Sequence, residues 1–554
     1  MAYAIGVDYG TQSGRVILLD LHSGHEKAIS VVPYKHGVID SVLPTTGTKL
    51  PVDWALQDPS DYLEVLHEGI PMVMREGKVN AGDVIGLGVD FTSCTVLPVN
   101  EDGMPLCLMS RWQNHPHAWP KLWKHHSAQP IADRINQVAE RRGEEFLSRY
   151  GGRISAEWYF PKLIEVFEED REVYNACYRF VEATDWIVWY LTGEERRNSC
   201  TAGYKAMWSE HEGIPGTEFF ASVSSEFVNP KEKLGEVFYP LGTRAGYLKG
   251  AVADKLQLHS GVAVAVGNVD AMVSVPSVGV KGLGALVMVM GTSICHLAVT
   301  KEESRFEGIT GVVKDGVLPG YYGYEAGQAA VGDMFEWFVK KLVPQAYFKA
   351  AASYKVSIFE HLENLAAKLL PGESGLIALD WWNGNRSILG DADLSGIILG
   401  FTLSTAPEAI YRTLLESTAF GTRRIVENFT EHGVAIDRLV ACGGLAQRSP
   451  LLMRIYADAC GLPVSVASST EIPARGSAMF GAVAAGKEHG GFESITEASQ
   501  HLVSPVLKSY LPEEVVHRKY NELYQIYREI HDFFGIERVD ILHRLKGIRM
   551  NSAV

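Results

Sequence analysis

The chain has 554 residues, well beyond the roughly 250 to 300 at which one hydrophobic core stops growing, so we expect two or more domains. Apolar residues make up 46% and charged residues 21% of the chain, a globular composition that excludes a wholly disordered or collagen-like protein. The net charge of −15 disfavours nucleic acid and anionic membranes as partners.

The cysteines and the N-terminus predict a cytoplasmic protein. Seven cysteines are scattered without a CxxC pair, which indicates free thiols in a reducing compartment. Asp8 stands where a signal peptide would need apolar residues. Residues 261–280 are mostly apolar, but Asn268 and Asp270 near their centre favour a buried strand, a polar turn and a helix over a membrane span.

The first predicted element is a hairpin. The apolar run Tyr3 to Val7 ends in a glycine-rich turn, and Arg15 to Asp20 is again mostly apolar. Two similar runs, 285–290 and 294–299, flank a second Gly-Thr turn about half the chain later. This repeat predicts two domains of one plan that hold a ligand between their turns, whereas a chance recurrence of a common dipeptide is the alternative. The predicted domains are residues 1–280 and 281–554.

Strand-like and helical patterns alternate along the rest of the chain, which favours an α/β fold. The predicted strands are 84–91, 262–267 and 439–442, and the predicted helices are 61–75, 161–167, 408–429, 450–460, 476–486 and 512–534. The helix at 476–486 consists mainly of small residues and can approach neighbouring backbone closely. The amphipathic helix at 512–534 is predicted to be a docking element.

Three glycine turns are candidate sites for a nucleotide. Amides freed by glycine, together with hydroxyls and a guanidinium, suit a polyphosphate, while simple hairpin turns are the alternative interpretation of the first two. A Gly-Gly pair after the strand at 439–442 opens a helix, whose amides and dipole can face a nucleotide. No Walker-type lysine loop is present. The candidate ATP ligands are Gly10, Thr11, Ser13, Arg15, Gly291, Thr292, Ser293, Gly443, Gly444 and Gln447.

Two aspartates are candidates for phosphoryl-transfer chemistry, which needs a carboxylate to accept a proton and cations to neutralise the phosphate oxygens. Asp270 follows an apolar run and precedes a helical one, so it suits the proton-accepting role, and helix N-cap is its structural alternative. Asp8 suits the orientation of hydrated Mg²⁺.

These motifs resemble a known family. DYGTQSGR, VMGTS, ACGGLAQ and GSAMFGAVAAG are similar, in order, to the two phosphate motifs, the adenosine motif and the second connecting motif of the superfamily that unites actin, hexokinase and the heat-shock ATPases. Residues 396–416 resemble the signature of the FGGY carbohydrate kinases. The resemblance implies a two-domain actin- and hexokinase-like (ribonuclease H-like) fold with an interdomain cleft, ATP and Mg²⁺ as cofactors, and Asp270 as the catalytic base.

Other stretches resemble the L-ribulokinase branch of this family, which implies a ketopentose, L-ribulose, as the small-molecule partner. They are residues 88–93, 122–126, 150–158 and 196–208. The same resemblance implies that the sugar lies among Ser93, Trp123, Lys205, Asp270 and Glu325. A cation, carboxylates and a flat apolar wall suit a polyhydroxy ketone.

Several alternatives stay open at this point. Without the resemblance, Lys205 fits a solvated surface charge and Glu325 fits a partner for an arginine. Trp123 likewise fits a core aromatic, and Ser93 a strand-end hydroxyl. Relatives carry aspartate where this chain has His125, so the polar contacts on that wall of the pocket are in question. Rival functions are a xylulokinase or other polyol kinase and a non-kinase ATPase, and the sequence leaves homo-oligomerisation undecided.

Overall fold

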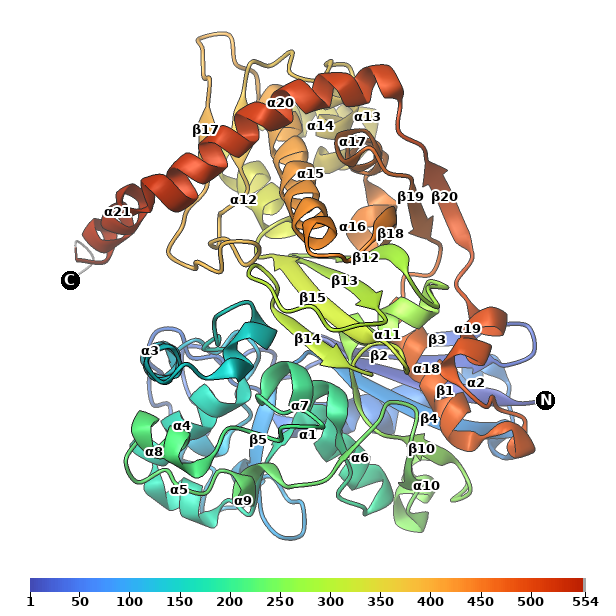
Figure 1. Ribbon diagram of the computed structural model, residues 1–554. Coiled ribbons are helices and arrows are strands. Elements are labelled where there is room, and N and C mark those ends of the chain that lie inside the picture. The colour runs from blue at the N-terminus through green and yellow to red at the C-terminus, as the bar shows by residue number, and fades with distance from the viewer. Residues whose placement is uncertain (552–554) are drawn as a thin grey trace.

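The computed structural model describes residues 1–551, which form two α/β domains, each built on a seven-stranded mixed sheet (Figure 1). The first sheet runs in the order β3 (Glu26–Pro33), β2 (Ser13–Asp20), β1 (Tyr3–Tyr9), β4 (Val84–Phe91), β10 (Ala263–Ala265) and β9 (Arg244–Tyr247), with β11 (Asn268–Val269) also paired to β4. The second runs β14 (Gly311–Lys314), β15 (Tyr322–Gln328), β13 (Ile294–Thr300), β12 (Gly284–Met290), β18 (Ile436–Cys442), β19 (Val464–Ala467) and β20 (Val506–Tyr510).

The two sheets follow one plan. Each contains an antiparallel hairpin, β1–β2 or β12–β13, whose first strand pairs in parallel with the next strand of the sheet, β4 or β18. A second parallel strand, β10 or β19, and an antiparallel strand, β9 or β20, complete each sheet on that side. The predicted repeat is therefore confirmed, and chance recurrence of a dipeptide does not explain it.

Helices cover both faces of the first sheet, which explains why β1 is buried at all seven of its positions. One face is covered by α1 (Pro59–Glu64), the π-helical turn Val65–Gly69 and α2 (Ile70–Gly77), which together occupy the predicted helix 61–75. The other face is covered by α18 (Ile472–Ala485). The hairpin is thus held rigidly from both sides.

Helix α18 follows the second sheet in sequence but lies against the first, as Figure 1 shows beside β1 and β4. The backbones touch directly: a Cβ atom on Gly6 would lie 1.8 Å from the carbonyl oxygen of Ala474, and one on Gly88 would lie 1.9 Å from that of Ser477. The close approach predicted for this small-residue helix is confirmed. Because α11 (Asp270–Ser277) also contacts both sheets, α11 and α18 join the two domains.

The predicted helix 450–460 is present as α17 (Pro450–Cys460), and the other predicted helices have slightly different bounds: α4 (Tyr159–Glu169), α15 (Pro407–Glu431) and α20 (Glu514–Asp532). The sequence analysis missed a further helix at the end of the chain, α21 (Val539–Asn551). In Figure 1, α20 crosses the second domain and α21 continues from it toward one side.

Smaller elements complete both domains. The first domain adds α3 (Gln129–Arg142), α5 (Arg171–Ala176), α6 (Ala183–Thr192), α7 (Ser199–Lys205), α8 (Thr217–Val223), α9 (Lys231–Leu234), α10 (Gly250–Leu256), and the strand pairs β5 (Val96–Val99) with β6 (Arg179–Glu182) and β7 (Arg197–Asn198) with β8 (Phe238–Tyr239). Later in the chain come α12 (Gly332–Leu342), α13 (Gln345–Tyr354), α14 (Ile358–Ala366), the pair β16 (Ile377–Leu379) with β17 (Ile397–Leu399), α16 (Gly444–Arg448) and α19 (Ile495–Leu502).

The cysteines and the apolar run at 261–280 agree with the sequence analysis. All seven cysteines are free thiols, and five of them are buried. The apolar run forms β10, β11 and α11, although the polar Asn268 belongs to a short strand rather than a turn. Within residues 1–551, none of the helices combines the length and apolar character that crossing a bilayer requires.

Candidate active site

The two Gly-Thr turns are similar but not identical, because the glycine N–H donates to a serine carbonyl three residues on in the first turn and two residues on in the second. In the first, the N–H of Gly10 donates to the carbonyl oxygen of Ser13 at 3.1 Å, and in the second, the N–H of Gly291 donates to that of Ser293 at 2.9 Å. Each turn closes the hairpin at the end of a central strand of its sheet. The structure thus places Gly10 to Ser13 and Gly291 to Ser293 at matching positions in the two domains.

Arg15, the guanidinium predicted for the first turn, lies between two carboxylates. Its Nη1 is 3.4 Å from Oδ2 of Asp8, and its Nε is 3.3 Å from Oε2 of Glu471, which directly precedes α18. The side chain keeps 36% of its exposure, so its outer N–H groups remain accessible to an anion. Its contact with ATP stays a prediction.

Asp8 belongs to a row of polar residues across three neighbouring strands. It is in register with Asp90 of β4, and Asp90 is in register with Asn268 of β11. Burial raises the pKa of Asp8, while the charge of Arg15 opposes that rise. Burial together with the negative charge of Asp8 raises the pKa of Asp90 well above its ordinary value. Three side chains with oxygen ligands therefore meet at one edge of the first sheet.

Asp90 is a site residue that the sequence analysis missed. Its Oδ2 accepts a hydrogen bond from the hydroxyl of Ser477 in α18 at 2.5 Å, whereas Oδ1 is buried without a hydrogen-bond partner. The side-chain nitrogen of Asn268 is buried and unpartnered as well. The available signal was that Asp90 ends an apolar strand in the same way as Asp8.

Asp270, the predicted base, is the first residue of α11 and lies two positions beyond Asn268. The N-cap residue is Val269, so the alternative role of Asp270 as an N-cap is wrong, although its Oδ1 accepts from the N–H of Ala271 at 2.7 Å. Burial raises its pKa to about 7, with a further contribution from the charge of Asp8. A carboxylate with that pKa can accept a proton near neutral pH.

Lys205 and Glu325 form a buried ion pair between the two domains. Nζ of Lys205, at the end of α7, lies 2.7 Å from Oε2 of Glu325 in β15, and both side chains are at most 10% exposed. Burial lowers the pKa of Lys205, but the charge of Glu325, its hydrogen bond to Lys205 and the charges of other neighbours together outweigh this, and the net shift is upward. The surface role for Lys205 is therefore wrong, and Glu325 pairs with a lysine rather than an arginine. The same two residues influence the pKa of Asp270.

Trp123 connects the predicted sugar residues to the first phosphate turn. Its indole N–H donates to Oγ1 of Thr11 at 3.1 Å, and the side chain is only partly buried. Ser93 follows the end of β4 and is also partly buried, with its hydroxyl 3.6 Å from the sulfur of Cys94. Their contacts with a sugar stay a prediction.

His125, two residues after Trp123 in the chain, is fully buried. Its Nε2 is 3.0 Å from Oε2 of the buried Glu165, which also pairs with Nζ of Lys121 at 2.9 Å, and its Nδ1 accepts from the N–H of Ala55 at 3.2 Å. Burial lowers the pKa of His125 to about 3, so the ring is neutral. The residue thus supports the segment that carries Trp123, and both of its ring nitrogens are already occupied.

The third glycine turn follows β18. Gly443 has a φ of 96°, and a Cβ atom there would lie 2.4 Å from the carbonyl oxygen of Met290, so only glycine fits this strand exit. Gly444 begins the short helix α16. The side-chain nitrogen of Gln447 donates to three backbone carbonyls, those of Ala467, Ser468 and Ser469. That amide shapes the turn, and contacts of these three residues with ATP stay a prediction.

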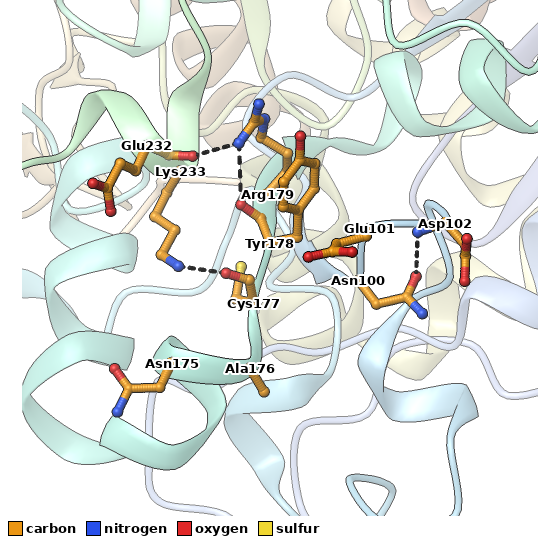
Figure 2. Close-up of a pocket in the computed structure, with 10 residues that line it drawn as sticks. All are labelled: Asn100, Glu101, Asp102, Asn175, Ala176, Cys177, Tyr178, Arg179, Glu232 and Lys233. Carbon is orange, nitrogen blue, oxygen red and sulfur yellow. Dashed lines mark hydrogen bonds between the residues drawn. The ribbon is translucent and has the colours of Figure 1, made fainter.

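A polar cavity of about 550 Å³ lies elsewhere in the first domain, and Figure 2 shows the side chains that line it. Its two cations are already engaged, because Lys233 donates to the carbonyl oxygen of Cys177 and Arg179 donates to those of Tyr178 and Glu232. None of the predicted site residues lines this cavity. We therefore assign the cavity no part in phosphoryl transfer.

The residues at the end of the first sheet fit a hydrated divalent cation. Mg²⁺ prefers oxygen ligands and keeps several of its waters. Asp8 and Asp90 supply carboxyl oxygens from neighbouring strands; burial raises the pKa of both, a bound cation would favour their ionised forms, and Oδ1 of Asp90 is buried without a hydrogen-bond partner. Such an oxygen is costly to leave unsatisfied, so a water of a hydrated cation suits this position.

Both halves of the chain match known sequence families. Residues 3–276 match the N-terminal domain and residues 286–485 the C-terminal domain of the FGGY family of carbohydrate kinases. The chain is 54% identical to a ribulokinase of Halalkalibacterium halodurans, with 99% of this chain and 97% of that protein covered. It is 44% identical to a ribulokinase of Mycolicibacterium smegmatis, with 99% and 97% covered.

Solved structures of sugar kinases share the fold. The xylulose kinase of Rhodospirillum rubrum superposes with a TM-score of 0.77 at 20% sequence identity, over 98% of this chain and all of that one. A xylulose kinase of Brucella ovis gives a TM-score of 0.78 at 17% identity, over 96% of this chain and 99% of the other. At such low identities the likeness concerns the fold and not the substrate.

Proposed function

The chain belongs to the FGGY family of carbohydrate kinases, and we propose that it transfers the γ-phosphoryl group of ATP to the 5-hydroxyl of L-ribulose. One observation supports this most strongly. Asp270, whose pKa burial raises to about 7, lies among the charges of Asp8, Lys205 and Glu325. The site therefore combines a base with groups for both the phosphate and a polyhydroxy acceptor, in a chain that is 54% identical to a ribulokinase.

Asp270 performs the acid–base step of the proposed reaction. The sugar oxygen attacks the γ-phosphorus, its proton passes to the carboxylate of Asp270, and the bond from the γ-phosphorus to the bridging oxygen breaks to release ADP. A pKa of about 7 leaves a large share of the carboxylate ionised at neutral pH. The first turn of α11 fixes this side chain through the N–H of Ala271.

The two glycine turns bind and orient the phosphates. Thr11 and Thr292 occupy matching turns, so their amides and hydroxyls can contact one triphosphate from two sides. Asp8 and Asp90 would hold hydrated Mg²⁺, which supplies positive charge to the phosphate oxygens when bound. Arg15 adds a fixed cation next to Asp8.

Residues from both domains bind the sugar in this proposal. Lys205 donates to sugar oxygens, Glu325 accepts from hydroxyls, and Trp123 forms an apolar wall next to Thr11. Ser93 adds a hydroxyl at the end of β4. We place the enzyme in the cytoplasm, because its seven unpaired cysteines suit a reducing compartment.

A coupled assay that follows ADP formation tests the function. The purified enzyme is given ATP and Mg²⁺ with L-ribulose, D-ribulose, D-xylulose, ribitol or glycerol. We expect the highest kcat/KM with L-ribulose. A higher value with D-xylulose would replace the proposed substrate within the same family, and ATP consumption that no sugar changes would refute the sugar-kinase proposal altogether.

A further inference from the structure

Helix α4 carries two buried ionisable residues that the proposed function does not use. Lys162 and Glu165 are 0% and 1% exposed. They are three residues apart, so both lie on one face of the helix. Charged side chains are costly to bury unless they are paired or hydrogen-bonded, so their partners show what this face of α4 holds in place.

Lys162 joins two segments that carry predicted sugar residues. Its Nζ donates to the carbonyl oxygen of Cys94 at 2.8 Å and to that of Leu122, also at 2.8 Å. Cys94 directly follows Ser93, and Leu122 directly precedes Trp123. One amino group therefore ties the backbone next to Ser93 to the backbone next to Trp123.

The backbone at Cys94 is in a conformation that needs such support. Its φ is 66°, in the left-handed region that is unfavourable for a residue with a side chain. The side chain is buried, and the carbonyl oxygen of the next residue, Thr95, accepts from the N–H of Ala183 at 2.7 Å. The hydrogen bond from Lys162 stabilises this turn and so fixes the place of Ser93 after β4.

Glu165 holds the second segment on both sides of Trp123. Its Oε2 lies 2.9 Å from Nζ of Lys121 and 3.0 Å from Nε2 of His125. These two residues precede and follow Trp123 by two positions each. Together with the hydrogen bond from Lys162 to the preceding carbonyl, they leave the backbone at Trp123 little freedom to move.

The two segments also contact each other and the first phosphate turn. Val96 and Lys121 exchange backbone hydrogen bonds at 3.1 and 2.8 Å, close to the amino group of Lys162. The indole N–H of Trp123 donates to Oγ1 of Thr11 at 3.1 Å. The junction that Lys162 completes is therefore connected to the turn predicted to bind phosphate.

Hydrogen bonding, and not packing alone, accounts for a lysine at this position. Burial lowers the pKa of Lys162 to about 8, and the acidic groups of Cys94, Glu157 and Glu182 limit the fall. Most of the amino group is thus protonated at neutral pH, and a charged donor forms stronger hydrogen bonds than a neutral one. An apolar side chain would fill the same space without the cost of a buried charge.

We propose that Lys162 is a positioning residue for sugar binding, which holds Ser93 and Trp123 at the separation that L-ribulose requires. This inference rests on the proposed function. Lys162 is fully buried, and its amino group is occupied by the carbonyls of both segments, so it acts through these two residues and not by contact with the sugar.

Kinetics of Lys162→Met test the proposal, because methionine keeps most of the length of the side chain and removes its donors. We expect KM for L-ribulose to rise about 10- to 100-fold, the scale of losing hydrogen bonds from a charged donor, and KM for ATP to change by less than about twofold. Lys162→Gln keeps an uncharged N–H donor and should recover part of the loss. An unchanged sugar KM in Lys162→Met, or an equal rise of both KM values, would overturn the proposal.

Double-mutant cycles separate positioning from a general loss of structure. If Lys162 acts through Trp123 and Ser93, Lys162→Met should raise the sugar KM much less in Trp123→Ala or Ser93→Ala than in the wild type. Coupling with either residue supports the proposal, and additive effects in both cycles would refute it. Lys162→Gln takes the place of Lys162→Met in the cycles if the methionine variant does not fold.

Lys233→Met is the matched control. Lys233 also donates to a backbone carbonyl in the first domain, that of Cys177, and it lines the polar cavity that none of the predicted site residues reaches (Figure 2). Urea unfolding measures the stability that each lysine contributes. We expect Lys233→Met to leave both KM values unchanged whatever its stability, and a rise of the sugar KM as large as in Lys162→Met would contradict a specific role for Lys162.

Failure of the proposed function is visible in the wild type. If another sugar is preferred, the substrate assignment fails, and the same cycles are run with that sugar, where coupling supports the role of Lys162 and additivity refutes it. If no sugar stimulates turnover, both proposals fall.

Discussion

The ends of the two central hairpins share a backbone but not their chemistry. In the first sheet, Asp8 lies opposite Asp90 on the neighbouring parallel strand, and in the second sheet the corresponding pair is Val289 and Cys442. Both hairpins continue into a Gly-Thr turn in which the glycine N–H donates to a serine carbonyl, three residues on in the first turn and two residues on in the second. The repeated plan thus supplies two turns, whereas the carboxylates that suit proton transfer and Mg²⁺ occur in the first domain.

The two hairpins also differ in what lies beside them. In the first sheet, the strand next to Asp90 carries Asn268 and leads to the base candidate Asp270. In the second sheet, the chain that follows Cys442 forms the glycine turn at Gly443. The carboxyl groups of Asp8 and Asp90, which we call the acidic edge, suit metal and proton chemistry. A glycine turn instead suits the close approach of a flat ligand. The shared strand plan thus supplies a glycine turn in each domain, and the residues next to the two turns differ in their chemistry.

Removing Asp270 should have the largest effect, because it takes away the only proposed proton acceptor. We expect Asp270→Ala to lower kcat by at least ~10², the scale of losing a general base. Asp270→Asn keeps the shape of the side chain and should lose as much. Calorimetric titration with ADP should show nearly unchanged binding in both variants, and near-normal turnover in either would exclude Asp270 as the base.

Asp8 tests whether the acidic edge holds Mg²⁺. In Asp8→Asn we expect the Mg²⁺ concentration for half-maximal activity to rise about 10- to 100-fold, the usual cost of losing an outer-sphere partner. Asp20→Asn, at the other end of the same hairpin, is the control and should behave as the wild type. A metal dependence that is unaltered in Asp8→Asn would remove Asp8 from the metal site.

The pH dependence of the reaction tests the environment of Asp270. A general base must be deprotonated, and burial raises its pKa to about 7, so kcat/KM for the sugar should fall about tenfold for each pH unit below that value and level off above it. An ordinary aspartate would keep full activity down to about pH 4 to 5. Initial rates between pH 5 and 9 measure this, and a flat profile down to pH 5 would contradict the raised pKa.

The sequence predicted the parts of the site that depend on local pattern. Glycine turns after apolar strands identified both hairpins, and Asp270 was recognised because a carboxylate between an apolar strand and a helix is unusual. The sugar residues Lys205 and Glu325 came only from family resemblance, since they are 120 residues apart and meet through the fold. The structure pairs these two side chains, and their contact with a sugar stays a prediction.

What escaped prediction depends on contacts between distant segments. In the sequence, Asp90 looks like the end of any apolar strand. Its special position depends on Ser477 of α18, which is 387 residues away in the chain. The alternative role of Lys205 as a surface charge was wrong because burial between domains is invisible in one segment. For the same reason, no periodicity indicates that His125 packs against Glu165 rather than facing a ligand.

The smallest expected effect concerns the link between the acidic edge and α18. Ser477→Ala removes the hydrogen bond to Oδ2 of Asp90 and leaves both oxygens of a buried carboxyl group without a donor, which should lower the free energy of unfolding by about 1 to 3 kcal/mol. Ser499→Ala is the control: its hydroxyl is equally buried but donates to the backbone carbonyl of Pro276 at 2.7 Å.

Urea unfolding of the two serine variants compares these hydrogen bonds directly. A bond to a neutral carbonyl contributes only about 0.5 to 1.5 kcal/mol, so Ser477→Ala should lose more than Ser499→Ala if the carboxyl group carries charge in the folded enzyme. Equal losses would mean that Asp90 is held as the neutral acid. In that case Asp8 alone would supply the negative charge of the acidic edge. The charge difference between the two sheets would then come from Asp8, which occupies the position of Val289 in the second sheet.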